Sequence, residues 1–293
     1  MDTVKKPKHR GLGRVLLFSG LVLGTAGLLW RLSAPAAPGK NTAAGEGGAP
    51  AVQETLPKAE GLPRPAFPAE ETGLSDGEKL RRIELSGDYP EELIRLARKN
   101  RETIGFVYDY PGLKDRHPAV DLSREAAGEQ VPLLLQWDPR WGCLPYGDGI
   151  LADSGCGPLC LSMAALRLTG DPSWTPERVA QLAVEHGWRV PGSGSSWTLI
   201  SEGAELLGLR AAELNLSEKE MKEALEEGKV LILVVGPGDF TQGGHFLVVT
   251  GWQEGGFSVN DPNSRVNSRK LWPYERLRPQ ILNLWALEKQ PGS

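Results

Sequence analysis

From residue 158 to the C-terminal end of the sequence, helical patterns come first and strand patterns follow. The helical patterns lie at 158–170, 175–187, 195–208 and 217–228, and each ends at a glycine. The strand patterns are KVLILVVG at 229–236, GHFLVVTGW at 244–252, GFSVN at 256–260 and ILNLWALEK at 281–289, and QEG at 253–255 predicts a hairpin turn. Helices grouped ahead of strands predict an α+β fold, with helices packed on a mostly antiparallel sheet.

The main domain is predicted to span 131–288, with a short tail at 289–293. It opens with VPLLLQW, which predicts a strand. Residues 70–130 are predicted to form a helical arm packed on this domain. Within the arm, SDGEKLRRIEL predicts a helix, and DYPEELIRLARKN predicts a second helix that is capped by Asp88 and ends at Asn100. FVYDYPG then predicts an extended piece and a turn.

The N-terminal segment has the pattern of an export signal. Residues 15–30 carry no charge and lie between a basic flank and Arg31. As a helix they would span about 24 Å, a little less than the roughly 30 Å of bilayer hydrocarbon. We expect 1–31 to be a signal anchor, with a signal peptide cleaved near 34–36 and a buried core helix as alternatives. Residues 32–69, rich in proline, alanine and glycine, predict a disordered linker.

This reading predicts the location of the protein. An anchor would give a single-pass cell-membrane protein with an extracellular domain, and a cleaved signal would give a secreted one. The formal net charge of −4 gives no reason to expect a nucleic acid partner. We expect a monomer.

The three cysteines are too few for a disulfide scaffold. Cys156 and Cys160 are four residues apart, where disulfide geometry is poor, but a bridge between Cys143 and Cys160 stays open. No two cysteines have a second pair that would complete a zinc site, and the chain has four histidines. The sequence therefore predicts neither a metal nor a cofactor.

The stretch DSGCGPLCLS at 153–162 places Cys156 between two glycines where a helix begins. The thiolate is the nucleophilic form of cysteine, and the N–H groups and dipole at a helix N-terminus stabilise it. Pro158 needs no amide donor there, and Gly157 is expected to let a substrate carbonyl approach the Cys156 amide as oxyanion donor. Cys156 is therefore the predicted nucleophile, the alternative being a small buried residue. Cys160, inside the apolar helix, is expected to pack in the core.

A cysteine nucleophile needs a general base. His245 follows two glycines and opens a strand, so its ring can face a cleft. The alternative is a hydrogen-bonded core histidine. The other histidines are predicted to lie elsewhere: His9 in the basic flank, His117 in a loop and His186 in the last turn of a helix.

The third residue of the predicted triad is Asp261, at the end of the strand that follows His245. A hairpin closing at 253–256 brings both residues to one end of the sheet, where Asp261 can orient the imidazole. A purely structural turn is the alternative, and Asn260 or Asn263 would substitute for Asp261 if the register differed. Gln136 is the candidate side-chain donor to an oxyanion, unless it is only a polar residue at a strand end.

Four motifs together resemble cysteine peptidase family 39 in its stand-alone, exported form. They are QWDPRW at 136–141, SGCGP at 154–158, GDFTQGGHFLVVTGW at 238–252 and NDPNS at 260–264. The family includes bacteriocin-processing peptidases that cut after double-glycine leaders. The resemblance covers about 131–288 and implies a papain-like fold, with Cys156 as nucleophile, His245 as base and Asp261 as orienting carboxylate.

The sequence also departs from the leader peptidases. They keep an oxyanion glutamine a few residues before the cysteine, where this chain has Ile150 and Leu151, and Gln136 lies farther upstream. The chain also has no nucleotide-binding GKS/T loop and no multi-span membrane region, so it is not a bacteriocin exporter.

The predicted function is that of a thiol hydrolase that cleaves a peptide or isopeptide bond, with a peptide or a cell-wall peptide as substrate. Two alternatives stay open. A transpeptidase would use the same triad with an amine as acceptor, and a non-catalytic module of the same fold would bind wall peptides or a partner.

Overall fold

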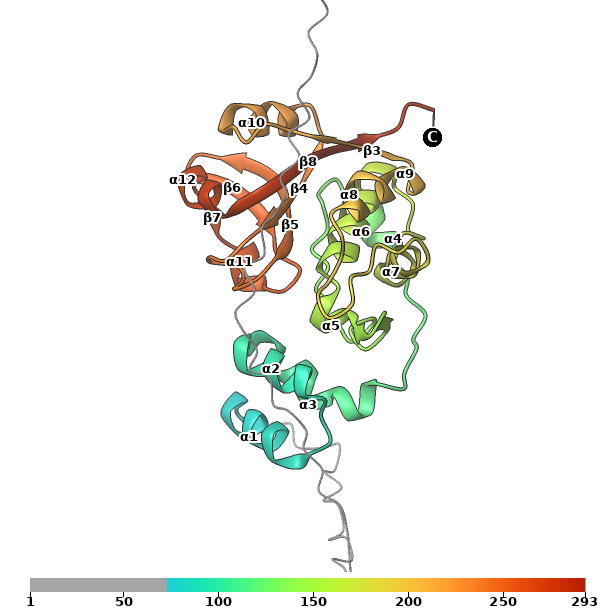
Figure 1. The fold of residues 1–293 in the computed structure, drawn as a ribbon, viewed down its shortest axis with the longest axis vertical. Helices are drawn as coiled ribbons and strands as arrows, with labels where there is room; N and C mark the ends of the chain where they lie inside the picture. The colour runs from blue at the N-terminus through green and yellow to red at the C-terminus, as the bar shows by residue number, and fades with distance from the viewer. Residues whose placement is uncertain (1–72, 293) are drawn as a thin grey trace, which may run out of the picture. The chain divides into compact units, whose positions relative to one another are not determined.

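The computed structural model describes residues 73–292 (Figure 1). The anchor or signal peptide predicted at 1–31 and the linker predicted at 32–69 lie outside the described residues. In the part that is described, no helix is long and apolar enough to cross a membrane.

A six-stranded sheet of order β3-β8-β4-β5-β6-β7 forms one side of the main domain, and all its neighbouring strands are antiparallel. Its strands are β3 (Leu209–Glu213), β4 (Val230–Val235), β5 (His245–Gln253), β6 (Gly256–Asn260), β7 (Leu271–Trp272) and β8 (Ile281–Lys289). Every residue of β4 is buried, as its continuous apolar run predicts. A separate small hairpin pairs β1 (Pro145–Tyr146) with β2 (Gly149–Ile150).

Helices cover both faces of the sheet (Figure 1). On one face, Ile232 and Val234 of β4 share a core cluster with residues of α6; on the other, Leu231 and Leu233 share one with Met221. The domain is therefore α+β, as predicted. Its helices are α5 (Leu151–Ser154), α6 (Cys156–Thr169), α7 (Pro176–Glu185), α8 (Thr198–Ser201), α9 (Gly203–Leu206), α10 (Glu218–Glu226), α11 (Arg265–Ser268), α12 (Tyr274–Leu277) and the 3-10 helix η2 (Arg278–Gln280).

The segment ahead of this domain is helical. It contains α1 (Asp76–Ser86), α2 (Glu91–Lys99), the 3-10 helix η1 (Arg101–Thr103), α3 (Ile104–Leu113) and α4 (Ser123–Ala126). Apolar residues of α1, α2 and α3 form a third core cluster that also includes Leu135, Trp137 and Ala152 of the main domain. The first three helices and η1, here called the arm, therefore share a core with the segment that leads into α6.

Two local predictions in the arm are wrong. FVYDYPG lies inside α3, where Pro111 sits in the last turn and Phe106 and Val107 are buried. Because Pro111 is close to the C-terminal end, packing of the earlier turns outweighs the local cost of a helical proline. Helix α2 is capped by Pro90 and not by Asp88, and it ends at Asn100 as predicted.

The strand predicted for VPLLLQW is also wrong, because residues 131–135 are extended without a partner strand. Pro132 has no backbone N–H to donate. The Asn260 side chain donates instead to the carbonyls of Val131 and Pro132, both at 3.1 Å, and the Gln136 N–H donates to the Pro262 carbonyl at 2.7 Å. The helix predicted at 195–208 is split into α8 and α9, and β3 and β7 were not predicted.

Candidate active site

Cys156 is the first residue of α6, at the position predicted for it. Glycine is required on both sides of it. A Cβ at Gly155 would lie 2.6 Å from the Leu151 carbonyl oxygen, and one at Gly157 would lie 2.5 Å from Ser195 Oγ. The space that a side chain at Gly157 would occupy is thus filled by Ser195.

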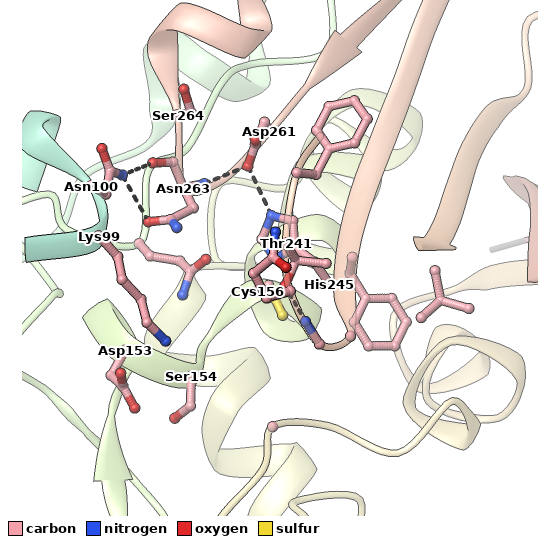
Figure 2. A pocket seen from close by; sticks show the side chains of 18 of the residues that line it. Lys99, Asn100, Asp153, Ser154, Cys156, Thr241, His245, Asp261, Asn263 and Ser264 are labelled. Atoms are coloured by element: carbon pink, nitrogen blue, oxygen red, sulfur yellow. Dashed lines mark hydrogen bonds and ion pairs between the residues drawn. The ribbon is translucent and has the colours of Figure 1, made fainter. Parts of the chain in front are cut away.

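The hairpin of β5 and β6 brings His245 and Asp261 to one end of the sheet, as predicted. Gln253 pairs with Gly256 at the turn, and Val248 pairs with Asn260 at the open end. His245 Nε2 lies 2.8 Å from Asp261 Oδ1 (Figure 2). The Cys156 side chain is hydrogen-bonded to that of His245.

The carboxylate of Asp261 is held by further donors. The Asn263 N–H donates to Oδ1 at 2.9 Å, and Asn267 Nδ2 donates to Oδ2 at 2.9 Å. The Asp261 side chain is only 1% exposed. The turn signal in DPNS and the orienting role predicted for Asp261 are therefore compatible, since the same oxygen serves both the turn and the histidine.

These contacts couple the ionisation of Cys156 to that of His245. Burial alone would raise the pKa of the Cys156 thiol, but the hydrogen bond and charge of His245, with backbone N–H groups of Phe246 and Gly157, outweigh burial and lower it. Burial likewise opposes the charged imidazole, yet Asp261 and Cys156 raise the pKa of His245 to about 10. Both shifts favour a thiolate beside an imidazolium.

The other two thiols differ from Cys156. All three cysteines are free, so the Cys143–Cys160 bridge is not formed. Burial raises the pKa of Cys143 to about 11 and holds that of Cys160 well above its usual value. Cys160 is fully buried within α6, as expected for a packing residue.

Gln136 lines the same cleft as Cys156 and is 3% exposed. Its Nε2 lies 3.3 Å from the Leu151 carbonyl and 3.4 Å from that of Ala152, both longer than a typical N–H···O bond. Since these carbonyls belong to α5, which directly precedes Cys156, the amide lies close to the helix start. Because both of these hydrogen bonds are long, the Gln136 amide is suited to donate to an oxyanion at this place.

The remaining candidates lie elsewhere or serve other contacts. Asn260 holds the carbonyls of Val131 and Pro132, and so does not replace Asp261. His186 is exposed and stacks on Trp188 at 4.8 Å, and His117 is exposed. Within residues 73–292, no group of acidic, histidine and cysteine side chains could hold a metal ion.

A cleft of about 710 Å³ surrounds the three side chains. One wall comes from the glycine-rich loop before His245, and another from residues 193–197. Arg95, Lys99 and Asn100 of the arm also line it. Figure 2 shows Lys99 and Asn100 at its edge. Sequence reasoning missed the arm residues, because no local pattern marks a contact between segments so far apart. It also missed Asn267, whose bond to Asp261 depends on the short helix α11.

Residues 129–291 match the model of the Peptidase_C39 like family. Comparison with curated proteins gives no match. Among solved structures, the peptidase domain of Streptococcus ComA, a bi-functional ABC transporter involved in a quorum sensing pathway, is 22% identical with a TM-score of 0.37, over 46% of this chain and 92% of that one. A C39-like peptidase from Bacillus anthracis is 17% identical with a TM-score of 0.37, over 58% of this chain and 98% of that one.

The assignment rests on the family model, because both structural overlaps are partial. That model spans more than half of the chain and includes every side chain of the Cys156–His245–Asp261 cluster. The chain therefore belongs to the C39-like peptidase family and is a cysteine peptidase.

Proposed function

We propose that Cys156, His245 and Asp261 act as a catalytic triad that hydrolyses a peptide or isopeptide bond. The observation that carries this proposal is the contact chain from thiol to imidazole to carboxylate, with the pKa of Cys156 lowered and that of His245 raised. Such a pair supplies a nucleophile and a proton donor at neutral pH.

Cys156 Sγ attacks the substrate carbonyl carbon, and the carbonyl electrons move to oxygen. The Cys156 N–H and Gln136 Nε2 stabilise this oxyanion. As the C–N bond breaks, the His245 imidazolium gives its proton to the leaving amine, which leaves a thioester. A water then attacks the thioester while His245 accepts a proton, and release of the acid restores the thiolate and the imidazolium. Asp261 keeps the ring oriented throughout.

Selective alkylation tests the thiolate that this mechanism requires. With limiting iodoacetamide at about pH 6, an ordinary thiol is almost fully protonated and reacts slowly. We expect Cys156 to be alkylated much faster than Cys143 and Cys160, measured by mass spectrometry of the peptides that contain them. Equal rates at the three cysteines would contradict the proposed mechanism. The Cys156→Ala variant supplies the background rate for the other two cysteines.

Product analysis identifies the bond and the acceptor. We expect neo-N-termini or released isopeptide-linked amines in samples treated with wild type and not with Cys156→Ser. New amide linkages in their place would show the transpeptidase reaction. If Cys156→Ala kept the cellular effect of wild type, the protein would be a binding module.

The cellular location is part of the proposal. We propose that 1–31 anchors the protein in the membrane with the peptidase domain outside, where a peptide or cell-wall peptide would be the substrate. The motive is the uncharged run at 15–30 behind a basic flank. Protease added to intact cells should degrade the domain. Protection until the cells are lysed would contradict this location.

A further inference from the structure

Asn100 and Glu102 of the arm contact the turn that carries Asp261. Both residues lie outside the segment that matches the family model. Asn100 Nδ2 donates to the Asn263 carbonyl at 2.5 Å and lies 3.2 Å from Asn263 Oδ1 (Figure 2). Trp137 Nε1 donates to the same Asn263 carbonyl at 3.1 Å. The peptide between Asn263 and Ser264 is thus held by two side-chain donors.

Glu102 holds the next part of the same turn. Its Oε1 accepts from Ser264 Oγ at 2.5 Å and from the Val266 N–H at 3.3 Å, and its Oε2 accepts from the Arg265 N–H at 2.9 Å. These N–H groups belong to the first turn of α11, which has no earlier carbonyls to bind them. A carboxylate at this place therefore fixes where α11 begins.

Both Asn100 and Glu102 are connected to the carboxylate of Asp261 through further hydrogen bonds of the turn. The route from Asn100 passes through Asn263, whose own N–H donates to Asp261 Oδ1 at 2.9 Å. The route from Glu102 passes through α11 to Asn267, whose Nδ2 donates to Asp261 Oδ2 at 2.9 Å. Asn100 also links the two routes, because its Oδ1 accepts from the Glu102 N–H at 3.0 Å.

We propose that Asn100 and Glu102 are positioning residues of the peptidase, which hold the 261–267 turn so that Asp261 faces His245. This inference rests on the proposed triad. Neither side chain needs to touch the substrate. Their effect reaches Cys156 through the imidazolium, since a displaced Asp261 would no longer hold the charge on His245. The arm then contributes to the active site by positioning Asp261.

The test compares the pH dependence of Cys156 alkylation by iodoacetamide in the full chain with that in three variants. Glu102→Ala and Asn100→Ala should raise the apparent pKa of Cys156, and each unit of rise lowers the rate below that pKa about tenfold. Glu102→Gln keeps one acceptor oxygen, so its profile should lie between those of wild type and Glu102→Ala. A merely structural role would lower the melting temperature without moving this profile.

Glu84→Ala is the matched control. It removes an exposed ion pair with Arg98, 2.7 Å long, within the arm and away from the turn, and should leave the profile unchanged. If folded Asn100→Ala and Glu102→Gln showed the same pH dependence of Cys156 alkylation as wild type, the inference would be overturned, even if Glu102→Ala did not fold. Slow alkylation of wild type itself would instead contradict the proposed triad, so the two failures are distinguishable.

Discussion

At the residue scale, the decisive feature is the pKa of Cys156, which burial raises and which its hydrogen-bonding partners lower. Cys160 lies one helical turn further on, is equally an α6 residue, and has its pKa raised by burial. Cys156 differs because it sits at the helix start, where His245 and two backbone N–H groups face its sulfur. One turn of helix thus separates the proposed nucleophile from a packing residue.

The charge of Asp261 is predicted to account for much of the high pKa of His245. Asp261→Asn keeps an oxygen that can accept from Nε2–H but removes the negative charge. We expect the pKa of His245 to fall below its value of about 10, and that of Cys156 to rise. The imidazole resonances in an NMR titration measure the first change.

A second carboxylate in the cleft provides the control for this change. Asp153 lines the same cleft, so Asp153→Asn removes an equal charge without touching the hydrogen bond to His245. Its titration curve for His245 should stay close to that of wild type. If Asp261→Asn also left the curve unchanged, the thiolate alone would hold the imidazolium.

At the element scale, the site depends on α6 and the β5–β6 hairpin, and the sequence predicted both. Their signals are local: a glycine stop at Gly170, and turn residues between two apolar runs. Once the hairpin closes, the pairing of Val248 with Asn260 places His245 and Asp261 at one end. The predicted pair of His245 and Asp261 needed only this register, whereas its contact with Cys156 also depends on the packing of α6 on β5.

The parts that the sequence did not predict depend on contacts between distant segments. VPLLLQW is as apolar as a strand, but side chains and loop carbonyls take its hydrogen bonds in place of a neighbouring strand. FVYDYPG became helical because its residues bury against α1 and α2. Glu102 reaches the 261–267 turn only in the folded chain, and the bond of Asn267 to Asp261 within that turn depends on where α11 begins. The residue types of Glu102 and Asn267 are common at surfaces.

The loop before His245 is predicted to be held in place by Gln280. Gln280 Oε1 accepts from the Asp239 N–H at 2.6 Å, and its Nε2 donates to Asp239 Oδ2 at 2.8 Å. Gln280→Ala leaves this N–H without that acceptor, which should lower the local opening free energy by about 1 kcal/mol. Amide exchange in 237–244 should therefore be about fivefold faster, as measured by mass spectrometry.

Gln253→Ala is the corresponding control, because Gln253 is exposed at the far turn of the hairpin. It should leave exchange in 237–244 unchanged. Equal exchange in wild type and Gln280→Ala would show that the remaining backbone contacts, such as the bond from the Gly236 N–H to the Gln280 carbonyl, are enough to hold the loop.

At the scale of the whole molecule, the active site lies where the three packing units of the described chain meet. Cys156 begins a helix of the first core cluster, His245 begins a strand that contributes to both faces of the sheet, and Asn100 ends a helix of the arm. Separating any of these units would disturb the charges of the site. Global stability and the ionisation of the site should therefore be linked.

This linkage gives a prediction for stability against pH. The pKa of His245 is raised from 6.5 to about 10. Its contribution to the free energy of unfolding is therefore fully present below about pH 6.5 and is lost as the pH rises through about 10. The pKa of Cys156 is lowered from 9.0. Its contribution to the free energy of unfolding is therefore fully present above about pH 9 and is lost as the pH falls through the pKa of Cys156 in the folded protein. Above the folded pKa of Cys156, and between about pH 6.5 and 9, the two slopes oppose each other.

Cys156→Ala removes one of these two slopes. Asp261 still faces the imidazole, so the variant should lose stability as the pH rises from about 6.5, whereas in wild type the opposite slope of Cys156 offsets this loss. Urea unfolding of both proteins at several pH values measures the difference, in which the contributions of all other groups cancel. A constant difference in the free energy of unfolding from about pH 6.5 to 9 would mean that the imidazolium depends on the thiolate, and that Asp261 alone cannot keep the ring charged.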